Sequence, residues 1–222
     1  MFAVVIILPA IQAPANAQGT DTLIQKTSIR EFLAAAQAND VEVLQRALDQ
    51  GVPVDARDER GRTALLIATY HNAVEAAKRL IEGGADVNAT DALHDSPYLY
   101  AGAEGKLEIL KLTVAAGADL VSVNRYGGTA LIPAAHHGHV NVVRYLVATK
   151  IDLDHVNFLG WTALLEAVVL GDGGPIYQEI IRLLVDAGAD ITIVDKDGKT
   201  ALDLARASSQ SKVVEILENT KN

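Results

Sequence analysis

One stretch of sequence recurs along this chain at a nearly constant spacing. Five segments share a pattern of threonine or serine followed by small and apolar residues: GRTALLIA at 61, HDSPYLYA at 94, GGTALIPA at 127, GWTALLEA at 160 and GKTALDLA at 198. The intervals between them are 33, 33, 33 and 38 residues. A fixed period of this length is typical of repeat proteins, in which each unit packs mainly on its neighbours.

A second landmark keeps the same phase about twenty residues after each of these segments. It reads DQGVPVDA to position 56, EGGADVNA to 89, AAGADLVS to 122 and DAGADITI to 193, whereas TKIDLDHV near 150 lacks the glycine. Two landmarks with one period strengthen the interpretation as a repeat array.

Two short helical patterns lie between the landmarks of each unit. In the unit that starts at Gly127, one apolar face comprises Leu131, Ala134 and Ala135, and a second comprises Val140, Val143, Leu146 and Val147. Gly138 separates the two patterns. Neither helix is long enough to be stable alone, so each must bury its apolar face against the next unit.

The units resemble ankyrin repeats, with T-A-L or S-P-Y-L in place of T-P-L-H, then A-A-x-x-G-H and a G-A-D-x-N-like turn. The resemblance covers residues 28–219, with expected units at 28–57, 58–90, 91–123, 124–156, 157–194 and 195–219. It implies an all-α, elongated and curved solenoid of about six helix-turn-helix repeats. It also implies short hairpin fingers, a concave face lined by the first helices, and binding without catalysis.

Three departures from the family pattern matter. The T-P-L-H histidine is replaced by Leu66, Leu99, Ile132, Leu165 and Asp203, so we expect apolar packing instead of its hydrogen bond to the threonine. His94 stands where other fingers carry glycine, so either that turn differs or His94 has a positive φ. The insertion GDGGPIYQ at 171–178 predicts a loop between the two helices of the fifth unit, which either contacts a ligand or only absorbs the extra length.

The N-terminal sequence MFAVVIILPAIQAPANAQGT predicts export. Residues 2–8 form an apolar core too short to cross a bilayer, and Ala15-Asn16-Ala17 supplies a cleavage site before Gln18. We therefore expect a signal peptide over residues 1–17, a linker over 18–27 and a periplasmic or secreted mature protein without a membrane span.

Composition narrows the classes of partner. The chain has no cysteine, which excludes disulfides, thiolate metal sites and cysteine nucleophiles. Its formal net charge of −9 argues against nucleic acid, because non-specific affinity for phosphates needs a basic surface. The polar C-terminal segments SSQSK and ENTKN are typical of a capped end, so we expect a monomer.

A histidine cluster, His136, His137 and His139, is the most enzyme-like feature. His139 occupies the family's own G-H position at the start of the second helix, which favours a structural role. His136 and His137 are adjacent, and adjacent helical side chains diverge by about 100 degrees, whereas paired metal ligands on a helix are better placed at i and i+4. We therefore expect no metal site, no cofactor and no catalytic residue.

Binding residues are expected where the repeat prescribes nothing. Tyr126, Phe158, Leu159 and Trp161 form a candidate aromatic patch on two consecutive fingers, although Phe158 and Trp161 could instead cover the neighbouring hairpin as core. A second candidate strip on the solvent-facing side of the first helices comprises Tyr70, His71, Tyr100, Glu104, His136, His137 and Glu166. Pro133 lies in this strip, in a first turn where its missing N–H should cost little.

These observations favour a non-enzymatic, exported module that binds a protein partner as an adaptor, inhibitor or stabiliser, with a connection to stress permitted by the resemblance. A secreted effector that binds a host protein is a variant of this hypothesis. A metal-dependent hydrolase that uses the His136 and His137 region with Glu104 or Glu166 is an alternative from another class, and a self-assembling structural array is a third.

Overall fold

The computed structural model describes residues 28–220. The predicted signal peptide and most of the linker lie outside these residues. Within them, helical residues 28–38 are followed by eleven helices: α2 (Val41–Asp49), α3 (Ala64–Tyr70), α4 (Val74–Glu82), α5 (Pro97–Ala103), α6 (Leu107–Ala115), α7 (Leu131–His136), α8 (Val140–Val147), α9 (Ala163–Val169), α10 (Pro175–Asp186), α11 (Ala201–Ala207) and α12 (Ser211–Glu218).

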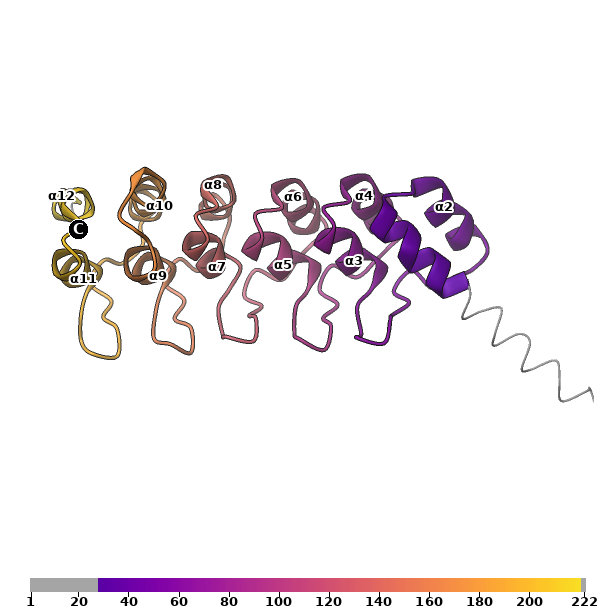
Figure 1. Ribbon diagram of the computed structural model, residues 1–222, viewed down its shortest axis with the longest axis horizontal. Helices are drawn as coiled ribbons and strands as arrows, with labels where there is room; N and C mark the ends of the chain where they lie inside the picture. The colour runs from indigo at the N-terminus through magenta and orange to yellow at the C-terminus, as the bar shows by residue number, and fades with distance from the viewer. Residues whose placement is uncertain (1–27, 221–222) are drawn as a thin grey trace, which may run out of the picture.

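The helices form two parallel layers in an elongated row (Figure 1). The first helices α3, α5, α7, α9 and α11 pack in succession, and the second helices α2, α4, α6, α8, α10 and α12 form the other layer. A finger projects before each of the helices α3, α5, α7, α9 and α11. Within residues 28–220 no strand longer than an isolated bridge is present. The all-α solenoid expected from the repeat period is confirmed.

The core is a continuous layer of aliphatic side chains between the helices. Small residues such as Ala68, Ala101, Ala134 and Ala167 recur on the first helices at equivalent positions and are completely buried. Their size lets neighbouring units approach closely, so the apolar face of each short helix is removed from water by the next unit. None of the helices in the described residues is long and apolar enough to cross a membrane.

A threonine or serine caps most of the first helices. The hydroxyls of Thr63, Ser96, Thr162 and Thr200 each accept a hydrogen bond from the backbone N–H three residues later. The expected loss of the threonine–histidine bond is offset by burial at Leu66, Leu99, Ile132 and Leu165, which are at most 3% exposed. The expectation was wrong for Asp203, because its carboxylate accepts a hydrogen bond from the Thr200 hydroxyl (2.7 Å). It also accepts one from the Thr200 backbone N–H (3.1 Å), which completes a capping box.

Pro133 changes the start of α7 more than the sequence suggested. Because proline has no N–H, the bond that Ile67 donates to Thr63 in the second unit has no counterpart here, and the N–H of Ile132 bonds the Thr129 carbonyl instead. The helix begins one residue later than its equivalents, and the buried hydroxyl of Thr129 has no hydrogen-bond partner among residues 28–220.

Each finger is closed by an acidic or amide side chain that the sequence analysis did not identify. Oδ1 at the equivalent positions Asp58, Asp91, Asn124, Asn157 and Asp195 accepts hydrogen bonds from the backbone N–H groups two and four residues later. The turn then requires a positive φ, which is 75° at Gly127 and 62° at His94. The strained alternative for His94 is therefore confirmed.

The insertion in the fifth unit is only partly a loop. Residues 171–174 connect the two helices, whereas Pro175 to Gln178 form the first turn of α10. The prediction of a loop was right for residues 171–174 and wrong for 175–178, because proline is well suited to the first helical position, where its missing N–H is not needed. The extra length becomes an added helical turn that packs against the preceding unit.

Candidate functional site

A groove of about 430 Å³ opens on the finger side of the third, fourth and fifth units. Its floor includes Gly128, at a position where other units carry Arg62, Asp95, Trp161 or Lys199, so the missing side chain leaves space between neighbouring fingers. Seven residues singled out in the sequence line this groove: Tyr100, Glu104, Tyr126, His136, His137, Leu159 and Glu166.

Glu166 is the most unusual residue of the groove. The other units carry Ile67, Tyr100, Pro133 or Leu204 at this position of the first helix. The sequence analysis placed Glu166 among solvent-facing residues, but it is only 5% exposed, because the finger and the neighbouring helix α7 cover it. Burial raises the pKa of its carboxyl from 4.5 to about 7, and the hydrogen bond from Asn157 opposes this shift.

Asn157 holds the Glu166 carboxyl in place. Its Oδ1 accepts two backbone hydrogen bonds within the finger, which leaves Nδ2 free to donate to Oε1 of Glu166 at 2.8 Å. An aspartate, as at Asp58 or Asp195, could close the turn but could not make this second bond. Asn157 is thus a site residue that the recurring finger position could have revealed, had it been compared with Glu166.

The histidines mainly bond to the protein itself. His137 Nδ1 and His139 Nε2 lie 2.7 and 3.1 Å from the carbonyl oxygen of Ala103, so each ring nitrogen carries a proton there and donates. Burial lowers the pKa of His139, whose ring also covers Gly105. His136 Nδ1 lies 3.7 Å from Oε2 of Glu166, and burial together with His137 lowers the pKa of His136.

Across the described residues, no group of three or more histidine, aspartate or glutamate side chains is placed to hold a metal ion.

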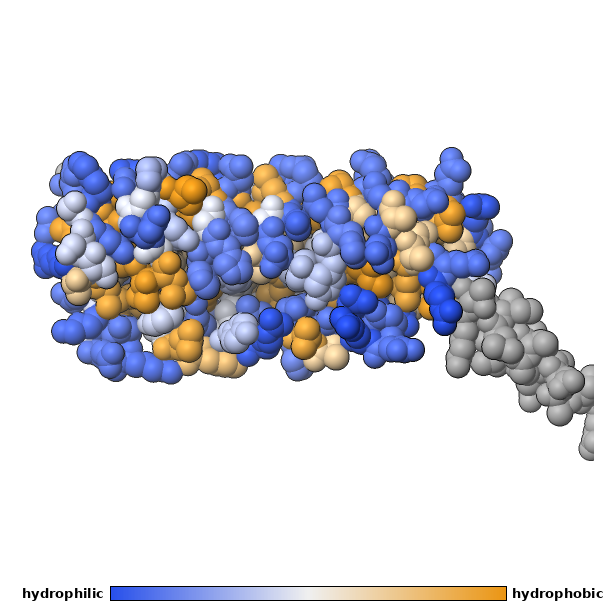
Figure 2. All heavy atoms as spheres, in the orientation of Figure 1, coloured by the Kyte–Doolittle hydropathy of each residue, from blue (hydrophilic) through white to orange (hydrophobic). Residues whose placement is uncertain are grey.

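The fingertip residues divide into exposed and packed groups. Tyr126, Phe158 and Leu159 are 59%, 70% and 51% exposed. Figure 2 shows hydrophobic residues gathered over the finger before α9, which carries Phe158 and Leu159, with a smaller group over the finger before α5. Trp161 differs, because its partly buried ring packs against the core. Phe158 is thus largely exposed although its ring lies over Gly127 of the preceding finger, whereas Trp161 packs against the core.

Tyr70 lies outside the groove. Its ring centroid is 3.9 Å from that of Tyr100, and the Arg62 guanidinium lies 5.7 Å from the Tyr70 centroid. Burial raises the pKa of Tyr70 to about 12. Tyr70 thus extends the aromatic surface toward the second unit through Tyr100, which does line the groove.

The groove is bordered by an ion pair between two fingers. Arg125 lies 3.4 Å from Asp95 and 5.1 Å from the centroid of the Tyr126 ring. This arrangement neutralises Asp95 and fixes Arg125 beside the exposed tyrosine. Neither member of the pair was singled out in the sequence.

The added turn of α10 supports the groove from behind. The Tyr177 hydroxyl donates a hydrogen bond to the carbonyl oxygen of His136 (2.8 Å), and Ile176 approaches Gly138. The insertion therefore does more than absorb the extra length, because its added turn buttresses the end of α7.

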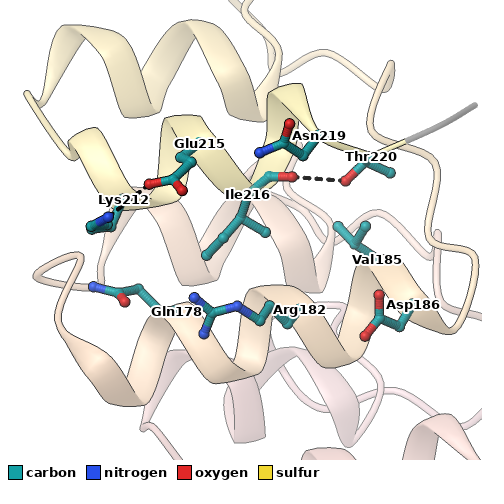
Figure 3. A pocket seen from close by; sticks show the side chains of 9 residues that line it. All are labelled: Gln178, Arg182, Val185, Asp186, Lys212, Glu215, Ile216, Asn219 and Thr220. Atoms are coloured by element: carbon teal, nitrogen blue, oxygen red, sulfur yellow. Dashed lines mark hydrogen bonds and ion pairs between the residues drawn. The ribbon is translucent and has the colours of Figure 1, made fainter.

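A second hollow lies in the other layer, between α10 and α12 (Figure 3). Its side chains are largely polar, and Lys212 pairs with Glu215 at 2.8 Å. Because this hollow carries no aromatic side chain, the finger-side groove is the stronger candidate for recognition.

A row of paired short helices with a projecting finger before each pair defines a helical repeat protein, a class whose extended surfaces serve in binding. Two models of ankyrin repeats match the sequence, one described as three copies over residues 98–195 and one described as many copies over residues 32–81. The chain belongs to the ankyrin-repeat family, and these repeats make it a protein–protein interaction module.

Solved structures give the same result. An ankyrin repeat domain from Acinetobacter baumannii is 53% identical, with a TM-score of 0.82, over 84% of this chain and 95% of that one. Another ankyrin repeat protein is 42% identical, with a TM-score of 0.83, over 87% of this chain and 98% of its own.

A sequence relative matches a shorter stretch. A putative ankyrin repeat protein of Escherichia coli (strain K12) is 44% identical over 52 residues, which are 23% of this chain and 26% of that protein.

Proposed function

We propose that this protein binds a protein partner through the finger-side surface of its third, fourth and fifth units. One observation carries the proposal: Tyr126, Phe158 and Leu159 are each more than half exposed on adjacent fingers, beside a groove of about 430 Å³. Exposed aromatic residues next to a concavity are where binding energy concentrates in protein interfaces. We call these three residues the fingertip patch.

The partner's native state is the species that a rigid repeat surface recognises. A protein that binds the native partner and not its unfolded chain raises the apparent stability of that partner by mass action. The same surface acts as an adaptor if a second protein binds elsewhere, or as an inhibitor if it covers an active site. A stabilising role fits conditions of stress, in which partners unfold more often.

The site of action that we propose is the periplasm or the exterior. The apolar segment at residues 2–8 and the Ala-Asn-Ala sequence before Gln18 support this location. N-terminal sequencing of the protein recovered from the periplasmic fraction should then give Gln18 as the first residue. A cytoplasmic protein that retains Met1 would contradict the location but not the binding surface.

Affinity capture from an extract of the native organism tests the binding surface. The native protein is compared with a variant that carries Tyr126→Ala, Phe158→Ala and Leu159→Ala, while Trp161 is left unchanged because it packs against the core. A matched control removes two exposed apolar side chains elsewhere, Val121→Ala and Val194→Ala. A partner lost only from the fingertip variant supports the proposal, whereas equal capture by all three forms contradicts it.

A further inference from the structure

The groove beside the fingertip patch contains a buried carboxyl with an incomplete set of hydrogen bonds. We infer that the groove receives a lysine side chain of the partner polypeptide and that the lysine ammonium group binds Oε2 of Glu166. The inference rests on the proposed function, because it names the chemical group that the same surface recognises.

The geometry of the carboxyl singles out one oxygen. Oε1 of Glu166 accepts the hydrogen bond from Asn157 at 2.8 Å. Oε2 lies 3.7 Å from His136 Nδ1, beyond hydrogen-bond distance, and no group among residues 28–220 donates a hydrogen bond to it. The Glu166 side chain is 7% exposed and lines the groove. A buried carboxyl oxygen at a groove surface favours a charged donor, since few other groups offset its desolvation.

The surroundings suit the stem and the charge of lysine. Ile132, Pro133, Leu159 and Leu170 line the groove with apolar surface that can cover the four methylene groups of lysine. Tyr100 and Tyr126 add aromatic surface, which attracts an ammonium group. An ammonium group is a compact charge that fits one available oxygen, whereas the planar guanidinium of arginine is best matched by two.

The charge balance of the groove also favours a cation. Its carboxylates are Asp95, Glu104 and Glu166, and Asp95 is already paired with Arg125. Glu104 is exposed at the groove and adds negative charge near its edge. A cationic side chain therefore meets a surplus of negative charge, whereas an anionic one meets repulsion.

Proton linkage makes the inference measurable. Since the pKa of Glu166 is about 7 in the free protein, a cation that binds only the ionised carboxyl must displace its proton. At pH 6 about one carboxyl in eleven is ionised, against about ten in eleven at pH 8, so binding should be about tenfold weaker at pH 6. Protonation of His136 at low pH acts in the same direction, because it places a second cation near Oε2.

The other charged groups around Glu166 do not reverse this sign. The His137 ring lies 4.7 Å from that of His136, between centroids, and its Nδ1 donates to the Ala103 carbonyl oxygen. On α11, which packs on the far side of α9, Asp203 bonds Thr200 and Arg206 pairs with Glu218. On α10, Glu179 pairs with Arg144 on α8, and Arg182 and Asp186 face the hollow toward α12.

The test uses Nα-acetyl-lysine methylamide, whose side-chain ammonium group is free, as the probe. Nα-acetyl-norleucine methylamide is its uncharged counterpart. Each compound is titrated into isotope-labelled protein at pH 6 and pH 8, and the NMR signals of the Glu166 carboxyl carbon and the Asn157 side-chain amide are followed. We expect a saturable shift with the lysine compound only, and we expect its affinity to be about tenfold lower at pH 6 than at pH 8. Glu166→Gln should abolish it, and Glu104→Gln should retain the pH dependence.

Three results would overturn the inference: no shift with the lysine compound, equal shifts with both compounds, or lysine binding that Glu166→Gln leaves unchanged. The pH dependence in the unsubstituted protein is a test that needs no variant and does not depend on how well Glu166→Gln folds. Failure here is separable from failure of the proposed function, because capture through the fingertip patch does not require Glu166.

Discussion

Replacement of Glu166 by glutamine tests the burial of this carboxyl through the pH dependence of stability. Below about pH 4.5 the carboxyl is protonated in both the folded and the unfolded chain, so it contributes no pH dependence to the free energy of unfolding. As pH rises, the unfolded chain loses the proton near its ordinary pKa of 4.5, whereas the folded protein keeps it until about pH 7. The native protein is therefore destabilised progressively across this window, and the loss is complete above pH 7.

The magnitude follows from the two pKa values. Ionisation of Glu166 costs the folded protein about 3 kcal/mol, of which about 2.5 kcal/mol develops between pH 5 and pH 8.5. Glutamine keeps an oxygen for the Asn157 bond and carries no charge at any of these pH values. The free energy of unfolding of Glu166→Gln should therefore rise relative to the native protein by about this amount over the same range.

Urea unfolding of both proteins at several pH values measures this difference, with Glu104→Gln as the control. Glu104 lies at the same groove but is exposed, so its replacement should shift stability by no more than about 0.5 kcal/mol at any pH. A difference between Glu166→Gln and the native protein that stays constant from pH 5 to pH 8.5 would refute the assignment of a buried carboxyl.

Four further substitutions test the fingers and helix caps by urea unfolding. Gly127→Ala should destabilise the protein by about 1–2 kcal/mol or more, because φ is 75° and the new Cβ would lie 2.6 Å from the Phe158 ring; an unchanged midpoint would contradict this contact. His94→Gly should stabilise the protein by up to about 1 kcal/mol, because it removes the strain of a positive φ, although the flexible glycine adds some entropic cost. A destabilised variant would show that contacts of the imidazole outweigh this strain. Thr162→Ala should cost about 1 kcal/mol, whereas Thr129→Ala should be nearly neutral because its hydroxyl caps nothing; equal costs would mean that the cap bonds do not matter.

The repeat period made the fold predictable because each unit repeats the same local interactions. Once GRTALLIA and its counterparts are aligned, the positions of both helices and of the fingers follow. The alignment left two alternatives open at His94, and the structure has the one with a positive φ. The prediction of a loop failed at Pro175, where proline begins a helix as readily as it ends one. It also failed at Asp203, where a replaced histidine was taken to mean a lost hydrogen bond.

The candidate site was only partly predictable, because burial depends on which neighbouring side chains are small. The sequence placed Tyr126 and Leu159 on the fingers and Glu166 in a separate, solvent-facing strip on the first helices, but it did not reveal that Glu166 is buried. Its position depends on the Asn157 amide, which donates to Oε1, and on the neighbouring helix α7, whose His136 lies 3.7 Å from Oε2. A repeat alignment compares equivalent positions and does not by itself compare contacts between non-equivalent ones.

Site-specific photocrosslinking tests the central claim most directly, because it reports which face of the solenoid touches the partner. A benzophenone side chain is placed at Tyr126 on the finger side or, as the control, at the exposed Asn141 on α8 in the opposite layer. After irradiation in an extract of the native organism, we expect one discrete crosslinked species from position 126 and none from position 141. A partner crosslinked from position 141 alone would contradict the account and assign recognition to the layer of second helices.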